Sequence, residues 1–159
     1  MICDAINMVG LKDFLSASRL SGLTMFVPTD IAFEKLAITQ SLKWNNLNSN
    51  TMTNLLLFHS SEANNGVKYN DLLCNEWLHM MNGEYTFTHC TNTKTNTNTN
   101  TNTNTKKYQI GRGNKDGRSD GDNNQISLKD SPLIIQPKDI SACNGIIHSI
   151  DTVMLPSSW

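Results

Sequence analysis

Two apolar segments near opposite ends of the chain constrain its fold most, because a stretch of low complexity lies between them. Residues 24–36 read Thr-Met-Phe-Val-Pro-Thr-Asp-Ile-Ala-Phe-Glu-Lys-Leu, and residues 144–156 read Asn-Gly-Ile-Ile-His-Ser-Ile-Asp-Thr-Val-Met-Leu-Pro. Residues 95–105 alternate strictly between Thr and Asn. The sequence therefore divides into a folded front, an inserted loop and a folded back.

The inserted loop lacks the side chains that a folded core needs. From residue 91 the apolar periodicity stops, and residues 106–125 are rich in Gly, Asp, Asn, Lys and Arg. Such a segment buries too little apolar surface to offset its ordering entropy. We predict that residues 91–124 form a disordered low-complexity insertion at the tip of a hairpin.

The composition fits a single domain over residues 1–159. Hydrophobic residues make up 38%, charged residues 17%, and the formal net charge is -1. The charge is nearly balanced, so it does not indicate a nucleic acid or an anionic membrane as partner. No apolar run approaches the roughly 20 residues of a membrane span. The first residues, Met-Ile-Cys-Asp-Ala, lack the pattern of a secretory signal.

The four cysteines leave their chemistry open. Cys3, Cys74, Cys90 and Cys143 permit two disulfides in three possible pairings. Their spacing is long and irregular, without a Cys-x-x-Cys motif, so no zinc site is expected. Free Cys packs as a small hydrophobe, which favours an interpretation as buried free thiols.

Local patterns in the front half predict helices around a short strand. Apolar residues at helical spacing indicate an amphipathic helix over residues 3–17. Residues 24–27 form a predicted strand, after which Thr29 or Asp30 caps a second helix. Residues 51–58 predict another core helix.

The remaining strands follow from turns and alternation. The Asn-Gly pair at residues 82–83 indicates a tight turn between strands at residues 77–81 and 85–88. Residues 133–135 predict a further strand. The last strand spans residues 145–155, where imperfect alternation indicates burial on both faces or a bulge.

These segments resemble the fasciclin domain (the fasciclin-like, beta-Ig-H3 family) in the family's order. Residues 24–36 and 144–156 resemble its two signature boxes. Residues 55–59, Leu-Leu-Leu-Phe-His, are similar to its apolar run ending in Tyr-His, with Phe58 in place of tyrosine. Residues 79–85 are similar to the segment that leads into its central hairpin.

The resemblance implies an α+β fold: a wedge of two small β-sheets with several helices packed on one side. It implies a non-enzymatic extracellular cell-adhesion or matrix-binding module without cofactor. The expected partner is a cell-surface or matrix protein, or a glycan, and the expected location is extracellular or the cell surface. Family members usually carry another helix first, so the chain is expected to be N-terminally incomplete. The alternative is an intracellular or orphan remnant of the fold without an adhesion role.

Two residue pairs are candidates for partner binding by the same resemblance. Asp139-Ile140 matches an Asp-Ile pair that some animal members are thought to use for integrin contact. Phe58-His59 resembles the Tyr-His pair implicated in adhesion. The structural alternatives are that Ile140 is a core residue and Asp139 turns the chain, and that Phe58 is core while the His59 ring bonds a terminal helix carbonyl.

Catalytic and metal sites are not expected. His148 with Asp30 or Asp151 and a serine would need a motif such as Gly-x-Ser-x-Gly to position a nucleophile, and none is present. The histidines lack metal-ligand spacing. Asp116, Asp120 and their neighbours fit neither frame of a calcium-binding loop.

Overall fold

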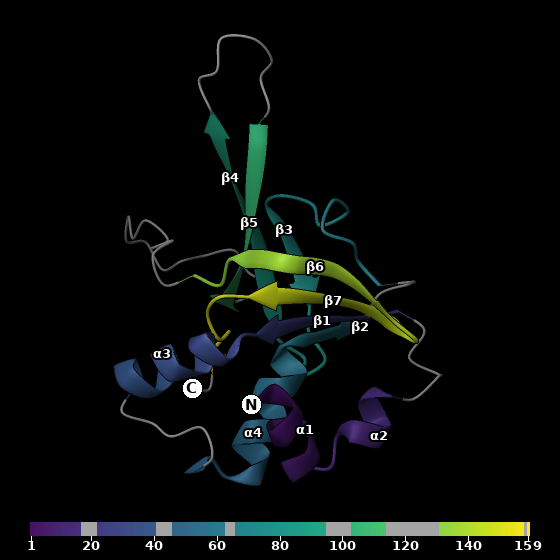
Figure 1. Cartoon of the computed structure of the whole chain (residues 1–159), viewed down its shortest axis with the longest axis vertical. Helices are drawn as coiled ribbons and strands as arrows, with labels where there is room; N and C mark the ends of the chain where they lie inside the picture. The colour runs from purple at the N-terminus through teal and green to yellow at the C-terminus, as the bar shows by residue number, and fades with distance from the viewer. Residues whose placement is uncertain (17–21, 41–45, 63–65, 95–102, 114–130, 158) are drawn as a thin grey trace.

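The computed structural model describes most of the chain as a set of helices and two small sheets (Figure 1). The described residues are 1–16, 22–40, 46–62, 66–94, 103–113, 131–157 and 159. Within them the element order is α1-α2-β1-α3-α4-β2-β3-β4-β5-β6-β7. The predicted α+β fold class is confirmed, with helices gathered at the end of the molecule opposite the tip of β4 and β5.

The helices begin and end at local signals. They are α1 (Ile2–Met8), α2 (Lys12–Leu15), α3 (Asp30–Gln40) and α4 (Ser49–Phe58). The single helix predicted over residues 3–17 is wrong in the described residues, because Gly10 with φ +70 separates α1 from α2. The hydroxyl of Thr29 accepts a hydrogen bond from the Ala32 N–H at 3.3 Å and so caps α3.

The two end segments lie side by side in a four-stranded sheet of order β2-β1-β7-β6. Strand β1 (Leu23–Pro28) runs parallel to β7 (Gly145–Ile150), from the pair Leu23↔Gly145 to the pair Pro28↔Ile150. The flanking strands are β2 (Ser60–Glu62) and β6 (Ile134–Ala142). The last strand is shorter than predicted, and its side chains alternate cleanly between buried and half-buried.

The second sheet is antiparallel, in the order β3-β4-β5. Strands β3 (Glu76–His79) and β4 (Tyr85–Lys94) form the hairpin that the Asn-Gly turn predicts, with Gly83 at φ +89. Strand β5 (Thr103–Gly113) pairs along β4, and the two strands extend as an arm beyond the other elements (Figure 1).

The predicted disordered insertion is therefore wrong in part. Residues 91–94 and 103–113 lie in β4 and β5. The register places Lys107 and Gln109 inward, where both are buried, and hydrogen bonds compensate for their polarity. Residues 95–102 and 114–124 of the predicted insertion lie outside the described residues.

A cystine, rather than buried thiols, links the second sheet to the preceding loop. Cys74 and Cys90 form a disulfide with Cα atoms 5.5 Å apart, whereas Cys3 and Cys143 are free and exposed. The interpretation as buried free thiols is therefore wrong. The Asn75 N–H donates to the Thr88 carbonyl at 2.7 Å, and this contact brings the chain before β3 beside β4.

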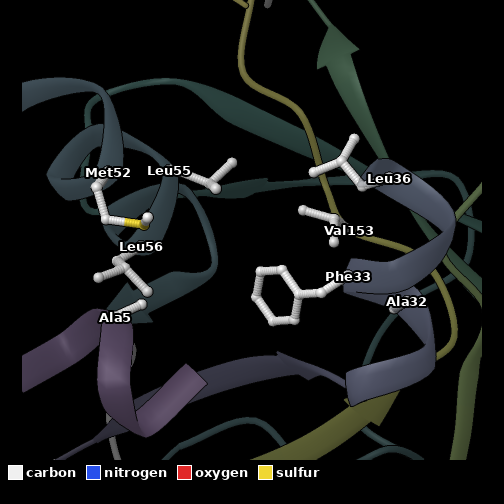
Figure 2. Close-up of a cluster of buried hydrophobic side chains, with 8 residues drawn as sticks. All are labelled: Ala5, Ala32, Phe33, Leu36, Met52, Leu55, Leu56 and Val153. Carbon is white, nitrogen blue, oxygen red and sulfur yellow. The ribbon is translucent and has the colours of Figure 1, made fainter. Parts of the chain in front are cut away.

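Helices α1, α3 and α4 bury their apolar faces against one another and against the segment that follows β7. Figure 2 shows Phe33 and Leu36 of α3 facing Leu55 of α4, with Val153 next to Leu36. The buried members of this cluster are Ala5, Ala32, Phe33, Leu36, Met52, Leu55, Leu56 and Val153. A second cluster joins the four-stranded sheet to the loop of residues 66–75 before β3; its members include Phe26, Phe58, Tyr69, Leu72, Ile134 and Ile150.

The entry to β7 requires a glycine because two backbones approach closely there. The Asn144 carbonyl accepts hydrogen bonds from the N–H groups of Gly22 and Leu23, and the Asn144 side chain donates to the Leu15 carbonyl at 2.6 Å. A Cβ atom at Gly145 would collide with the Leu23 backbone. The Asn-Gly start of the second segment thus fixes β7 against β1.

The substitution Gly145→Ala should lower the free energy of unfolding by at least about 3 kcal/mol, since backbone rather than a flexible side chain must move. Gly10→Ala is the matched control, because a Cβ at Gly10 meets open space and only the positive φ is costly, at about 1 kcal/mol. Urea unfolding followed by circular dichroism measures both. Equal losses in the two variants would contradict the close approach of β7 to β1.

Candidate functional site

A bulge in β6 presents the predicted Asp139-Ile140 pair. On β6, Ile135 pairs with Ser149 and Ile140 pairs with Ile147. Residues 136–139 therefore stand opposite the single residue His148 on β7. We call residues 136–139 the β6 bulge.

Asp139 turns the chain at the end of this bulge. Its φ is 57, in the left-handed region that Asp tolerates better than most residues. One carboxylate oxygen, Oδ1, accepts a hydrogen bond from the Tyr69 N–H at 2.6 Å, while 36% of the side chain is exposed. Asp139 thus holds the loop of residues 66–75 against β6, as the structural alternative expects of a turn residue.

Ile140 is not a core residue, because 39% of it is exposed. This part of the structural alternative is wrong. The side chain follows the bulge directly, so an apolar group stands in solvent beside a partly exposed carboxylate. The pair therefore forms a small mixed surface that a partner can reach.

His148 lies beneath the bulge as a neutral ring with both nitrogens engaged. Nε2 is 2.8 Å from the Val67 carbonyl, to which it donates, and Nδ1 accepts from the Asp139 N–H at 3.3 Å. Burial lowers the pKa of His148, and the ring is fully buried. The Asp139 Oδ1 atom lies 3.8 Å from Nδ1, but a nitrogen that accepts a hydrogen bond carries no proton to share with it.

A cationic cluster around Tyr69 fixes the loop that faces the bulge. The Lys107 Nζ donates to the carbonyls of Tyr69 and Leu72, each at 2.6 Å, and to that of Asn70 at 3.4 Å. The Lys138 Nζ lies 3.2 Å from the centroid of the Tyr69 ring. The Tyr69 hydroxyl donates to the Thr105 carbonyl at 2.6 Å. The loop, the bulge and β5 are thereby joined.

The Phe58-His59 pair lies in the core. Phe58 is 0% exposed and His59 is 1% exposed. The His59 Nδ1 donates to the Leu55 carbonyl at 2.7 Å, and Nε2 accepts from the Met154 N–H at 3.0 Å. This burial favours the structural interpretation of the pair over direct contact with a partner.

The residues considered for a catalytic triad have other roles in this structure. Asp151 accepts a hydrogen bond from the Leu133 N–H at 2.9 Å and one from the Thr152 hydroxyl at 3.1 Å. The ring nitrogens of His148 are bound to backbone groups, as described above. Within the described residues, no three His, Cys, Asp or Glu side chains gather as metal ligands. In the same part of the chain, no helix has the length and apolarity needed to span a membrane.

Sequence reasoning missed three residues of this region: Tyr69, Lys107 and Lys138. Lys107 fell inside the predicted insertion, where its charge indicated a solvated loop. The short motif Val-Lys-Tyr at residues 67–69 carries no periodicity that sets it apart. These residues meet only through the register of β5 and the bulge in β6, which no local pattern encodes.

The structure thus has two small sheets with helices gathered at one end, and the buried rings of His59 and His148 bind backbone groups. A model of the fasciclin domain matches residues 1–156, and the chain belongs to the fasciclin domain family. This family is associated with cell adhesion, is commonly extracellular and is generally non-catalytic.

A solved structure supports the same fold. A FAS1 domain pair from the insect cell adhesion molecule fasciclin I matches with a TM-score of 0.53 and 15% sequence identity. The match covers 94% of this chain and 45% of that chain, so this chain spans less than half of the domain pair. No curated protein sequence matches significantly.

Removing the Lys107 ammonium should destabilise the fold. Lys107→Met keeps the apolar stem but leaves three loop carbonyls without their donor, which should lower the free energy of unfolding by about 2 kcal/mol. Lys106→Met is the matched control, since Lys106 is exposed, and should change it by less than about 0.5 kcal/mol. Urea unfolding measures both, and equal effects would contradict the role assigned to Lys107.

Acid should destabilise the fold through His59. Burial lowers the pKa of this ring from 6.5 to about 4. Between these values the unfolded chain binds a proton that the folded chain does not, so the free energy of unfolding falls as pH drops through this window. At pH 5 the loss from this group, relative to pH 7.5, should be about 2 kcal/mol.

The variant His59→Gln isolates this contribution, because its amide offers a donor and an acceptor but does not titrate. Urea unfolding at both pH values should give a pH-dependent loss that is smaller in His59→Gln than in the wild type by about 2 kcal/mol. An unchanged pH dependence would show that His59 does not titrate as its burial requires.

Proposed function

We propose that the chain is a non-enzymatic extracellular module that binds a cell-surface or matrix partner through the β6 bulge. The observation that carries the proposal is the exposure of Ile140 beside the Asp139 carboxylate. An apolar side chain next to a charge, held on a bulge between paired strand segments, presents a fixed two-part contact.

The surroundings of the bulge support this role. The Tyr69 N–H donates to one carboxylate oxygen of Asp139, and the His148 ring accepts a hydrogen bond from the Asp139 N–H. Both the carboxylate and the backbone of Asp139 are thereby held in place. Little conformational entropy then remains to be lost when a partner binds. A fixed contact of this kind suits the association of the family with adhesion.

The disulfide supports an extracellular location. Cystines persist in oxidising compartments and are rare in the reducing cytosol. Cys74 and Cys90 close a loop that includes all of β3, and a loop of about 15 residues adds roughly 3 kcal/mol in the chain-entropy model.

A second candidate is an intracellular or orphan remnant that keeps the fold without the adhesion role. The free, exposed thiols of Cys3 and Cys143 favour it, because exposed thiols are uncommon in proteins that work in oxidising surroundings. In this case the chain should fold, but cells should not attach to a surface coated with it.

A cell-attachment assay on surfaces coated with the whole purified chain tests the proposal. The double variant Asp139→Asn, Ile140→Ala should reduce attachment several-fold, since interface anchors of this size contribute about 1 kcal/mol or more each. Asn tolerates positive φ and keeps an oxygen for the Tyr69 N–H, so the bulge should keep its shape.

The matched control is Ile38→Ala, which removes an 80% exposed apolar side chain from α3. It should leave attachment unchanged. Wild-type attachment no higher than that of an albumin-coated surface would support the remnant instead. Equal attachment by the wild type and the double variant would assign adhesion to another surface.

A further inference from the structure

The outward face of the β3-β4-β5 sheet carries a concentration of aromatic side chains. Residues directly opposite each other share a face, as do alternate residues along a strand. The register pairs Trp77 with Phe87 and Phe87 with Ile110, His79 with Tyr85, and His89 with Tyr108. We call these seven residues, Trp77, His79, Tyr85, Phe87, His89, Tyr108 and Ile110, the aromatic face.

The opposite face of this sheet is polar and buried. The Thr86 hydroxyl donates to the Gln109 Oε1 at 3.1 Å, and the Gln109 Nε2 donates to the Thr88 hydroxyl at 2.8 Å. All three side chains are nearly inaccessible to solvent. Leu78 of β3 shares this face and packs against the second cluster, so the inward face is polar along β4 and β5 and apolar at β3.

The aromatic face is partly exposed to solvent. His79 is exposed, and the other six residues are partly exposed. Within the described part of the chain, none of the seven belongs to a buried apolar cluster or packs against one. Neighbouring rings contact each other instead: Trp77 and Phe87 have centroids 5.0 Å apart, and His79 and Tyr85 have centroids 4.9 Å apart. An apolar patch of this kind marks an interaction surface.

The charge on this face has one sign. Lys106 lies two residues before Tyr108 on β5, so it shares the aromatic face, and it is exposed. Among the described residues that share the face, none carries a carboxylate. A second copy of this face would offer no carboxylate to pair with Lys106, so the face fits an anionic partner better than itself.

The rings form a track along the strands. The rows His79–Tyr85, Trp77–Phe87–Ile110 and His89–Tyr108 follow one another, and Lys106 continues the line. Rows two residues apart on a strand are separated by about 7 Å. A linear ligand with repeating flat units can therefore lie on several rows at once.

From this arrangement we infer that the aromatic face binds an acidic oligosaccharide, a chain of sugar rings that carry carboxylates. The C–H face of a sugar ring is apolar and slightly positive, so it packs on the negative face of an aromatic ring. The Lys106 ammonium pairs with a sugar carboxylate. This surface is separate from the β6 bulge, and the inference does not depend on the function proposed for the bulge.

Isothermal titration calorimetry of the whole chain with a hyaluronan octasaccharide tests the inference. Binding should weaken as salt is added, because a charge pair contributes. Trp77→Thr and Tyr108→Thr should each weaken binding at least about tenfold, as lost aromatic stacking does elsewhere. Thr keeps the strand propensity of both positions, and the thermal midpoint checks that each variant folds.

Two further variants separate charge from stacking. Lys106→Gln changes only an exposed side chain; it should weaken binding by about threefold and reduce the salt dependence. Ile38→Ala on α3 is the control and should bind as the wild type does. A neutral oligomer of N-acetylglucosamine should bind more weakly than hyaluronan.

Three results would overturn the inference. The first is no measurable heat with hyaluronan at millimolar concentration. The second is binding that survives in Trp77→Thr, Tyr108→Thr and Lys106→Gln, or that is as tight for the neutral oligomer. The third is a dimer, seen by sedimentation, that dissociates in Trp77→Thr while hyaluronan does not bind, since the face would then belong to a second copy of the chain.

Discussion

Parallel pairing between β1 and β7 joins two ends of the chain that are more than a hundred residues apart in sequence. Six residues of each strand are in register, and the close approach at Gly145 permits no side chain between the backbones. Leu15 of α2 packs on this pair, in a buried cluster with Leu23 and Met25 of β1. The β6 bulge lies where β6 pairs with β7 on both sides of His148. Both the core and the candidate site therefore depend on this one pairing.

Buried polar side chains then connect the loops to this frame. His59 bridges the end of α4 to the Met154 backbone, and His148 bridges β7 to Val67. The buried Lys107 ammonium donates hydrogen bonds to three carbonyls of the loop before β3. Each of these groups is costly to bury alone, and each is compensated by backbone partners. These groups lie inside the protein, so the side chains that a partner can contact are others: Asp139 and Ile140 on the bulge, and the rings of the second sheet.

Sequence reasoning succeeded where the signal is local. The Asn-Gly turn with its alternating flanks predicted the β3-β4 hairpin, and the polar residue after Pro28 predicted the cap of α3. It failed at β5, because the inward residues of that strand are Lys107 and Gln109, whose partners lie far away in sequence. The cystine was missed for the same reason, since only strand register brings Cys90 beside Cys74. The Asp139-Ile140 pair came from resemblance alone, and its exposure depends on a bulge that no spacing encodes.

The arm of β4 and β5 gives the Thr-Asn repeat a particular property. A strand repeats every two residues, and so does the repeat. The paired segment that contains Asn92↔Thr105 and Thr93↔Asn104 can therefore gain or lose whole Thr-Asn units without turning any side chain to the opposite face. Copying errors in such a tract would change the reach of the arm and leave the register at Phe87 and Tyr108 intact. A change by whole Thr-Asn units would therefore leave the folded body as it is.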